Sequence, residues 1–220
     1  MFITMCGRFT LEPTTKFYER FEITNRLDDL VPRYNISPGQ MVPIITMNSP
    51  KKVEMMKWGL IPHWAKDPKI GYKMINARAE TVAEKPSFRN AFKNHRCLVP
   101  ASGFYEWKRT NGKKQPYFIH EKKEPLFAMA GLFEIWNNPV GEEIRTFTII
   151  TTEANSLMAK IHDRMPVILD EKNEDTWLQG EMEDIKKLLK PISSSGMESY
   201  KVSTAINSGK IDIKDLIKNN

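Results

Sequence analysis

The sequence is poor in cysteine, with only Cys6 and Cys97 among its 220 residues. Two cysteines cannot supply the disulfide framework of a small secreted domain, so a reducing, cytoplasmic setting is predicted. Long apolar runs are also lacking, because the least polar stretches, Leu126–Phe133 and Phe147–Ile150, fall well short of the ~18 residues that a membrane helix needs. The first residues show no basic region followed by an apolar core, so we expect neither a secretory signal nor membrane association.

Common motifs for metals and nucleotides are absent as well. The sequence has no CxxC or HExxH pair, no glycine-rich phosphate loop of either common type, and no GxSxG serine elbow. Its histidines are too scattered for a familiar zinc site, and they are His63, His95, His120 and His162. We therefore expect no metal and no cofactor, which leaves any chemistry to ordinary side chains.

The composition is that of a folded globular protein. Hydrophobic residues make up 40% and charged residues 27% of the chain, which argues against a wholly disordered protein. The length suits one domain over residues 1–220, ending in a short polar tail at residues 204–220. Basic residues exceed acidic ones by 33 to 27, a net charge of +6, which permits a polyanionic partner without requiring one.

Strand-like runs separated by short turns dominate the middle of the chain. Val42–Thr46 and Val53–Trp58 form one such pair, and Asn111-Gly112 is a typical hairpin turn because both residues accept positive φ cheaply. Further strands are expected at Cys97–Val99, Phe104–Lys108, Gln115–His120, Leu126–Trp136, Ile144–Thr152 and Pro166–Leu169. Helices are expected at Glu12–Phe21, Ser87–Asn94, Glu153–His162 and in parts of Thr176–Leu189. This order predicts an α+β fold of antiparallel sheets with peripheral short helices.

Cys6 is notable for the chemistry of a cysteine at a chain start. A free cysteine is most often a small buried apolar residue, which is the plain structural interpretation. If translation starts at Met5 and this methionine is removed, Cys6 becomes the first residue. Its amine could then condense with an aldehyde to an imine, and its thiol could close a thiazolidine ring. Such an amine has a pKa of about 7.7–8.0, so only about 10% is reactive at pH 7 without a nearby base.

Glu106 and His162 are the candidates for that acid–base role. Glu106 lies among Phe104, Tyr105 and Trp107, so alternation makes it either a solvent-facing strand residue or an inward carboxylate with a raised pKa. His162 ends a helix-like run, where the alternative to catalysis is a histidine satisfied by the helix C-terminus. The residue pattern alone leaves both choices open.

Two further segments carry binding chemistry. Asn76 and Arg78 share one face of an extended strand, where an amide and a guanidinium suit a phosphate and a hydroxyl, although a surface pair tied to a turn fits equally well. The segment from Trp58 to Trp64 could stack against or wedge an unstacked base, or it could simply cap the core.

Six short blocks follow one another along the chain. They are Met5-Cys6-Gly7-Arg8-Phe9, Tyr34-Asn35-Ile36-Ser37-Pro38-Gly39, Trp58-Gly59-Leu60-Ile61-Pro62, Ile75-Asn76-Ala77-Arg78-Ala79-Glu80, Phe104-Tyr105-Glu106-Trp107-Lys108 and Ile161-His162-Asp163-Arg164-Met165-Pro166. In this order they resemble the SOS-response-associated peptidase (SRAP) family of abasic-site-processing proteins, from Met5 to about Val202. The resemblance implies a single α+β domain of curved, barrel-like antiparallel sheets.

The resemblance also implies a function. Family members are sensors of abasic sites in single-stranded DNA that form a covalent thiazolidine crosslink through an N-terminal cysteine, protecting the site during the DNA damage response. The family name adds an autocatalytic peptidase that removes the residues before the cysteine, and the imine step is lyase-type Schiff-base chemistry. A monomer is expected, cytoplasmic and, in a bacterium, associated with the nucleoid.

Catalytic roles carry over by position in the matching blocks. Cys6 would form the adduct, Asn76 would orient the amine and the sugar, Glu106 would shuttle protons, and His162 would assist opening of the sugar ring.

Roles in DNA binding carry over in the same way. Arg8 and Arg78 would hold the flanking phosphates, and Pro38 would shape the wall of the site near the cysteine. Trp58 and Trp64 lie in the segment that supports or wedges the strand.

Two departures from the family pattern matter. Residues 1–4 precede the usual Met-Cys start, so residues 1–5 have to be absent from the mature protein for the amine of Cys6 to be free. Trp64 is followed by Ala65 where some members carry a second tryptophan, which makes the wedge smaller. Two other functions stay open: a thiol peptidase acting in trans through Cys6 and His162, and a non-covalent single-strand binding module.

Overall fold

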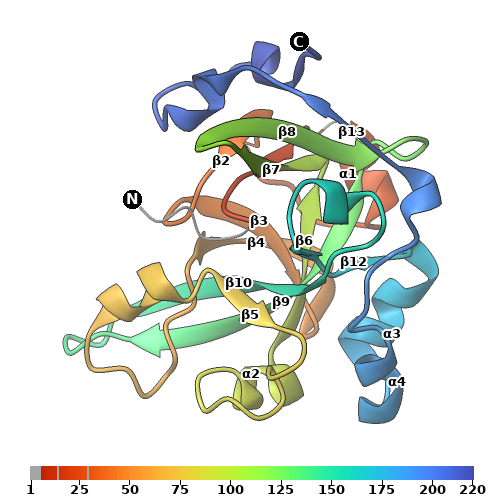
Figure 1. The fold of residues 1–220 in the computed structure, drawn as a ribbon. Helices are drawn as coiled ribbons and strands as arrows, with labels where there is room; N and C mark the ends of the chain where they lie inside the picture. Colours follow the sequence, from red (N-terminus) through yellow and green to blue (C-terminus); the bar gives the residue numbers. More distant parts are fainter. Residues whose placement is uncertain (1–5, 14, 29) are drawn as a thin grey trace.

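Two β-sheets dominate the computed structural model, which describes residues 6–13, 15–28 and 30–220 (Figure 1). The first sheet has five strands in the order β13-β8-β7-β1-β2, and every neighbouring pair is antiparallel. Its strands are β1 (Phe9–Leu11), β2 (Arg33–Ile36), β7 (Gly103–Thr110), β8 (Lys113–Glu121) and β13 (Met197–Lys201).

The second sheet closes on itself. Its pairings run β10-β4-β3-β6-β9 and return from β9 to β10, which makes a five-stranded ring. The ring strands are β3 (Met41–Thr46), β4 (Ser49–Trp58), β6 (Arg96–Ala101), β9 (Phe127–Asn137) and β10 (Glu143–Glu153). Three short strands join its margins: β5 (Asn76–Arg78), β11 (Arg164–Pro166) and β12 (Ile168–Leu169). The expected barrel-like α+β architecture is confirmed, although β4 and β5 run parallel to β10.

The hairpin between β7 and β8 turns where the sequence predicts it. Asn111 has φ 49° and Gly112 has φ 76°, the two positive angles that a tight hairpin turn requires. The resulting register places Glu106 opposite Tyr117 in β8.

The helices are short and peripheral, as predicted. They are α1 (Thr15–Arg20), α2 (Arg89–Asn94), α3 (Glu174–Gln179) and α4 (Met182–Lys187), with 3₁₀ turns η1 (Pro68–Lys73), η2 (Met158–Lys160), η3 (Glu171–Asn173), η4 (Ser194–Gly196), η5 (Thr204–Asn207) and η6 (Lys214–Ile217). None of the helices in the described ranges is long and apolar enough to cross a membrane.

The predicted helix at Glu153–His162 is wrong. β10 extends through Glu153, and the next regular element is the single turn η2. The side chain of Asn155 accepts a hydrogen bond from the Met158 nitrogen at 3.0 Å, while the Ala154 nitrogen donates to the carbonyl of Asp163. These contacts turn the chain back along β10 as β11, which brings His162 to the end of a tight loop rather than of a helix.

A buried arginine ties α2 and α3 to the barrel. Arg96 is 3% exposed and donates to the carbonyls of Phe92, Lys93, Trp177 and Leu178 at 2.7–3.0 Å. Carbonyls at helix C-termini carry partial negative charge, so they stabilise a guanidinium that forms no ion pair with any carboxylate among the described residues. Burial lowers the pKa of Arg96 from its ordinary value.

The segment predicted as a polar tail is packed against the first sheet. Residues 204–217, here called the C-terminal strap, cross the outer face of that sheet (Figure 1). Ile206 and Leu216 are 0% and 2% exposed and share a cluster with Tyr105 and Trp107 of β7. The strap therefore covers one face of β7, and the main core covers the other.

Trp58 belongs to the core, which corrects its predicted contact with DNA. Its side chain is 1% exposed, packs edge-on against Phe9 and stacks with Phe147, and its indole nitrogen donates to the carbonyl of Ile75 at 2.9 Å. Trp64, in contrast, is 50% exposed. Trp58 can only support the segment from beneath, whereas Trp64 is available on the surface.

The two tryptophans should differ sharply in their effect on stability. Trp58→Ala removes a buried ring and should lower the free energy of unfolding by about 3–5 kcal/mol. Trp64→Ala should change it by no more than about 0.5 kcal/mol, because its ring is half exposed. Urea unfolding followed by circular dichroism measures both, and equal losses would show that the two rings are not placed as described.

Candidate functional site

The register of the first sheet brings Cys6 beside Glu106. Phe9 of β1 pairs with Phe104 of β7, and the Tyr105 nitrogen donates to the carbonyl of Arg8 at 3.0 Å, which extends the ladder towards the chain start. Cys6 then lies level with Glu106, and its backbone nitrogen donates to Glu106 Oε1 at 2.6 Å. The carboxylate is therefore bound to the α-nitrogen of the cysteine.

This pair is almost inaccessible to solvent. Glu106 is 2% exposed and Cys6 is 3% exposed. Glu106 is thus the inward carboxylate of the two sequence alternatives. Burial raises its pKa above the ordinary carboxyl value, while the hydrogen bond from Cys6, the nearby His162 and the backbone nitrogen of Trp107 act in the opposite direction. A carboxyl with a raised pKa is suited to both accepting and returning a proton near neutral pH.

The thiol of Cys6 is held in its protonated form. Burial raises its pKa well above the ordinary value, the Glu106 carboxylate raises it further, and Arg164 acts in the opposite direction. Cys97 is buried as well, at 0% exposure, and burial alone raises its pKa. Only Cys6 therefore combines a thiol with an acid–base partner among the described residues.

His162 lies in the loop before β11. Its Nδ1 lies 2.8 Å from Asp163 Oδ1 and 3.1 Å from the backbone nitrogen of Arg164. The Arg164 N–H is an obligatory donor, so in the neutral ring Nδ1 accepts and Nε2 carries the proton. In the protonated ring Nδ1 would instead donate to Asp163. A positive charge on His162 would lower the pKa of the Glu106 carboxyl.

Two arginines lie on the short strands that pair with β10, Arg78 on β5 and Arg164 on β11. β5 places Asn76 against Ile149 and Arg78 against Thr151, and Arg78 is exposed. On the other margin, Arg164 Nη2 donates to the carbonyl of Thr151 at 2.7 Å. Arg78 and Arg164 therefore flank the same residue of β10.

Arg164 is a member of the site for which sequence reasoning gave no role. Its guanidinium grips both carboxylate oxygens of Glu80, which lowers the pKa of that carboxyl. It also favours the thiolate of Cys6. Its position in the sequence could have identified Arg164, because it lies two residues after His162 in the last of the six family blocks.

Arg8 and Pro38 lie on the β2 side of the site. Arg8 is half-buried, its Nη1 donates to the side-chain oxygen of Asn35 at 2.6 Å, and burial lowers its pKa. Pro38 is half-buried in the turn after β2, next to Gly39 with φ 87°. Contacts and charge effects among the described residues link Cys6, Glu106, His162 and Arg164, whereas Arg8 contacts Asn35.

The fold places the chain in a class of two-sheet α+β proteins. A solved structure from Bacteroides thetaiotaomicron is similar, with a TM-score of 0.91, 32% identity, and coverage of 98% of this chain and 100% of that one. Another, from Bordetella bronchiseptica, has a TM-score of 0.80, 25% identity, and coverage of 90% and 100%.

Sequence comparison identifies the family. The model described as SOS response associated peptidase (SRAP) matches residues 5–209. Abasic site processing protein YoqW of Bacillus subtilis is 49% identical over 97% of this chain and 99% of its own length. Abasic site processing protein HMCES of Xenopus tropicalis is 37% identical over 83% of this chain and 64% of its own length. The chain belongs to the SRAP family, which confirms the resemblance of the six blocks.

The charges around Cys6 predict how its thiol titrates. Glu106→Gln removes a negative charge and should lower the thiol pKa, whereas Arg164→Met removes a positive charge and should raise it. Ultraviolet absorbance of the thiolate against pH, in a Cys97→Ala background, measures both shifts. A shift in the same direction for both variants would contradict the placement of these charges.

Proposed function

We propose that the protein recognises abasic sites in single-stranded DNA and binds them covalently through a thiazolidine formed by Cys6, which shields the site during the DNA damage response. One observation carries this proposal: Glu106 contacts the α-nitrogen of Cys6 at 2.6 Å in a buried setting. An amine nucleophile at Cys6 would therefore be formed next to a proton acceptor. The net charge of +6 and the names of the relatives support DNA as the partner.

The reaction balances with no added oxidant or reductant. His162 assists opening of the sugar ring, which exposes the C1 aldehyde, and the neutral amine of Cys6 attacks its carbon. Glu106 takes a proton from the amine and returns one to the departing hydroxyl, so that water leaves and an imine forms. The thiol sulfur then adds to the imine carbon, and the thiol proton passes to the nitrogen. The ring closes with the loss of one water overall.

This chemistry requires Cys6 to be the first residue. Cys6 has φ 45°, in the left-handed region that residues with a side chain rarely occupy. Once the preceding residues are removed, Cys6 has no φ torsion, so the conformational free energy that this strained angle costs is no longer lost. Where residues 1–5 are translated, the thiol would attack the carbonyl carbon of residue 5. Glu106 would take the proton of the thiol as the sulfur attacks and pass it to the leaving nitrogen, and water would hydrolyse the thioester to release the peptide. Residues 1–5 themselves lie outside the described residues.

The surrounding residues supply the DNA contacts in this proposal. Arg78 and Arg8 hold flanking phosphates, Trp64 offers an exposed ring to an unstacked base, and Pro38 forms part of the wall. Asn76, beside Arg78 on β5, orients the sugar. The protein acts as a monomer in this scheme.

The raised thiol pKa argues against a thiol peptidase acting in trans. Such an enzyme needs a thiolate, usually formed beside a histidine or at a helix N-terminus. Here burial and then the neighbouring Glu106 carboxylate disfavour the thiolate of Cys6. A non-covalent single-strand binding module would show salt-sensitive binding without preference for abasic strands, and the first test below excludes or supports it.

The first test compares wild type with Cys6→Ala, both matured so that residue 6 is first. Wild type should give a heat-stable adduct with abasic single-stranded DNA without any reductant. Cys6→Ala keeps the amine but has no thiol, so it should give an adduct only when borohydride traps the imine. Gel electrophoresis after heating measures this. Equal heat-stable adducts from both proteins would rule out the thiazolidine.

The second test follows the rate of adduct formation against pH. In the mature protein the amine of Cys6 and the carboxyl of Glu106 titrate as a coupled pair. Wild type stays active while this pair holds a single proton, because the carboxyl can carry the proton and leave the amine neutral. Its rate should fall only as the pH drops through the raised pKa of Glu106 and the pair takes up a second proton.

Glu106→Gln should move this acidic limb up towards the pKa of the free amine, about 7.7–8.0. At neutral pH it should also slow the reaction by about 10²–10⁴. An unchanged profile and rate would return Glu106 to a structural role.

A further inference from the structure

Arg8 is a half-buried cation whose described partner is neutral. Its Nη1 donates to Asn35 Oδ1 at 2.6 Å, and none of the ion pairs among the described residues includes it. Arg164 differs, because its guanidinium is gripped by the carboxylate of Glu80. A guanidinium removed from water without a carboxylate is stabilised by any anion that can reach its remaining N–H groups.

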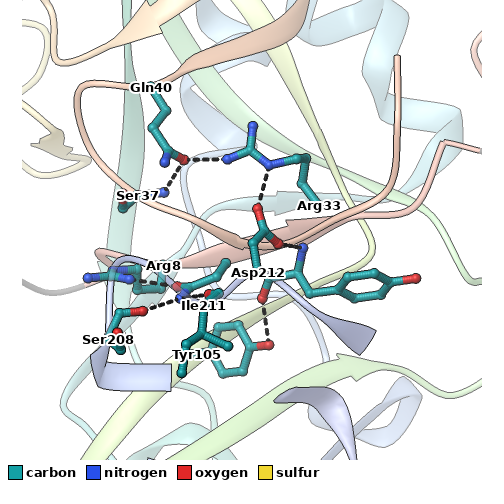
Figure 2. Close-up of polar contacts among 10 residues, drawn as sticks. Arg8, Arg33, Ser37, Gln40, Tyr105, Ser208, Ile211 and Asp212 are labelled. Atoms are coloured by element: carbon teal, nitrogen blue, oxygen red, sulfur yellow. Dashed lines mark hydrogen bonds and ion pairs between the residues drawn. The ribbon is translucent and has the colours of Figure 1, made fainter. Parts of the chain in front are cut away.

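The amide of Asn35 can face Arg8 in only one orientation. Asn35 is 3% exposed, and its Nδ2 donates to the carbonyls of Ile211 at 2.6 Å and Ser208 at 2.9 Å, with Ile206 at 3.5 Å. A flipped amide would set its oxygen against these carbonyls and its N–H groups against Arg8. The strap therefore decides which end of the amide meets the guanidinium (Figure 2).

The strap is also fixed to β2 by Arg33 and Tyr34, the two residues that precede Asn35. Asp212 accepts hydrogen bonds from the side chain of Arg33 and from the backbone nitrogen of Tyr34. The hydroxyl of Tyr105 donates to the carbonyl of Tyr34 at 2.8 Å (Figure 2). Three successive residues of β2 thus hold the strap, and two of their partners, Ile211 and Asp212, lie beyond residue 209, where the family match ends.

We propose that Asn35 is a positioning residue, locked by the C-terminal strap, that aims the guanidinium of Arg8 at a phosphate of the bound strand. This inference rests on the proposed function, since it assigns the phosphate to abasic single-stranded DNA. Asn35 touches neither the sugar nor the reacting atoms, and it acts through Arg8. The strap is then part of the DNA-binding apparatus although it lies on the outer face of the sheet.

The test separates phosphate recognition from the chemistry at Cys6. Four mature proteins are compared: wild type, Asn35→Ala, Arg8→Ala and the double variant. Each is reacted with abasic single-stranded DNA and with free 2-deoxyribose, which offers the same aldehyde without phosphates. Asn35→Ala should lower the ratio of the DNA rate to the deoxyribose rate at least tenfold. The double variant should be no worse than Arg8→Ala, because both changes remove one contact.

Salt dependence gives a readout that a merely structural role would not move. A lost phosphate contact reduces the slope of log rate against log salt by about 0.7 for a single strand. Asn35→Ala exchanges one neutral residue for another, yet it should reduce the slope as Arg8→Ala does. An unchanged slope, or an equal loss on DNA and deoxyribose, would overturn the inference.

A second variant keeps the test independent of the folding of Asn35→Ala. Asp212→Asn weakens the strap's attachment to Arg33 and should lower the same rate ratio and salt slope, while Asp175→Asn, the same exchange at an exposed residue of α3 outside the strap, should change neither. Equal ratios for these two variants would contradict the role of the strap. If wild type reacts with neither aldehyde, the proposed function fails instead, and the two failures are therefore distinguishable.

Discussion

The hydrogen bond from the Cys6 nitrogen to Glu106 is the interaction on which the rest of the site depends. A carboxylate that is 2% exposed is costly to bury, and donors at Cys6 and Trp107 offset part of that cost. In the proposed function the same contact places the proton acceptor on the α-nitrogen, where imine formation would begin, and together with burial it disfavours the thiolate that peptidase chemistry in trans would need. This contact therefore favours the proposed thiazolidine chemistry over a thiol peptidase that acts in trans.

The inward position of Glu106 depends on a second cover over its strand. Alternation puts Tyr105 and Trp107 on the face opposite Glu106, and these two large rings have to be buried somewhere. The C-terminal strap buries them, with Ile206 and Leu216 packed against them. Because the strap buries these two rings, the inner face of β7 can hold a polar group. The strap also accepts a hydrogen bond from Asn35, whose side-chain oxygen in turn accepts one from Arg8. Packing on the outside of the sheet and chemistry on its inside are joined by the same short segment.

The sequence predicts the strands well because their signals are local. The Asn111-Gly112 turn and the apolar runs on either side of it define β7 and β8 without reference to the rest of the chain. The strap was missed for the opposite reason: its residues are mostly polar, and its two buried anchors, Ile206 and Leu216, are too far apart to form a periodic pattern.

Among the site residues, sequence blocks identify the right segments but not which side chains meet. Cys6 and Glu106 are 100 residues apart, and only the β1–β7 register joins them. Trp58 fails as a DNA contact because a block motif does not reveal burial, and the ring contacts with Phe9 and Phe147 come from distant strands. Asn35 and Arg164 lie inside recognised blocks, yet their roles depend on partners that no local pattern shows.

The most direct measurement of the central claim is mass spectrometry of the adduct with abasic single-stranded DNA after digestion with trypsin and nuclease. Cleavage after Arg8 should release a tripeptide, Cys6-Gly7-Arg8, joined to the sugar remnant with the loss of one water. A peptide that retains residues 1–5 and still carries the sugar, or an adduct located on another residue, would contradict the account.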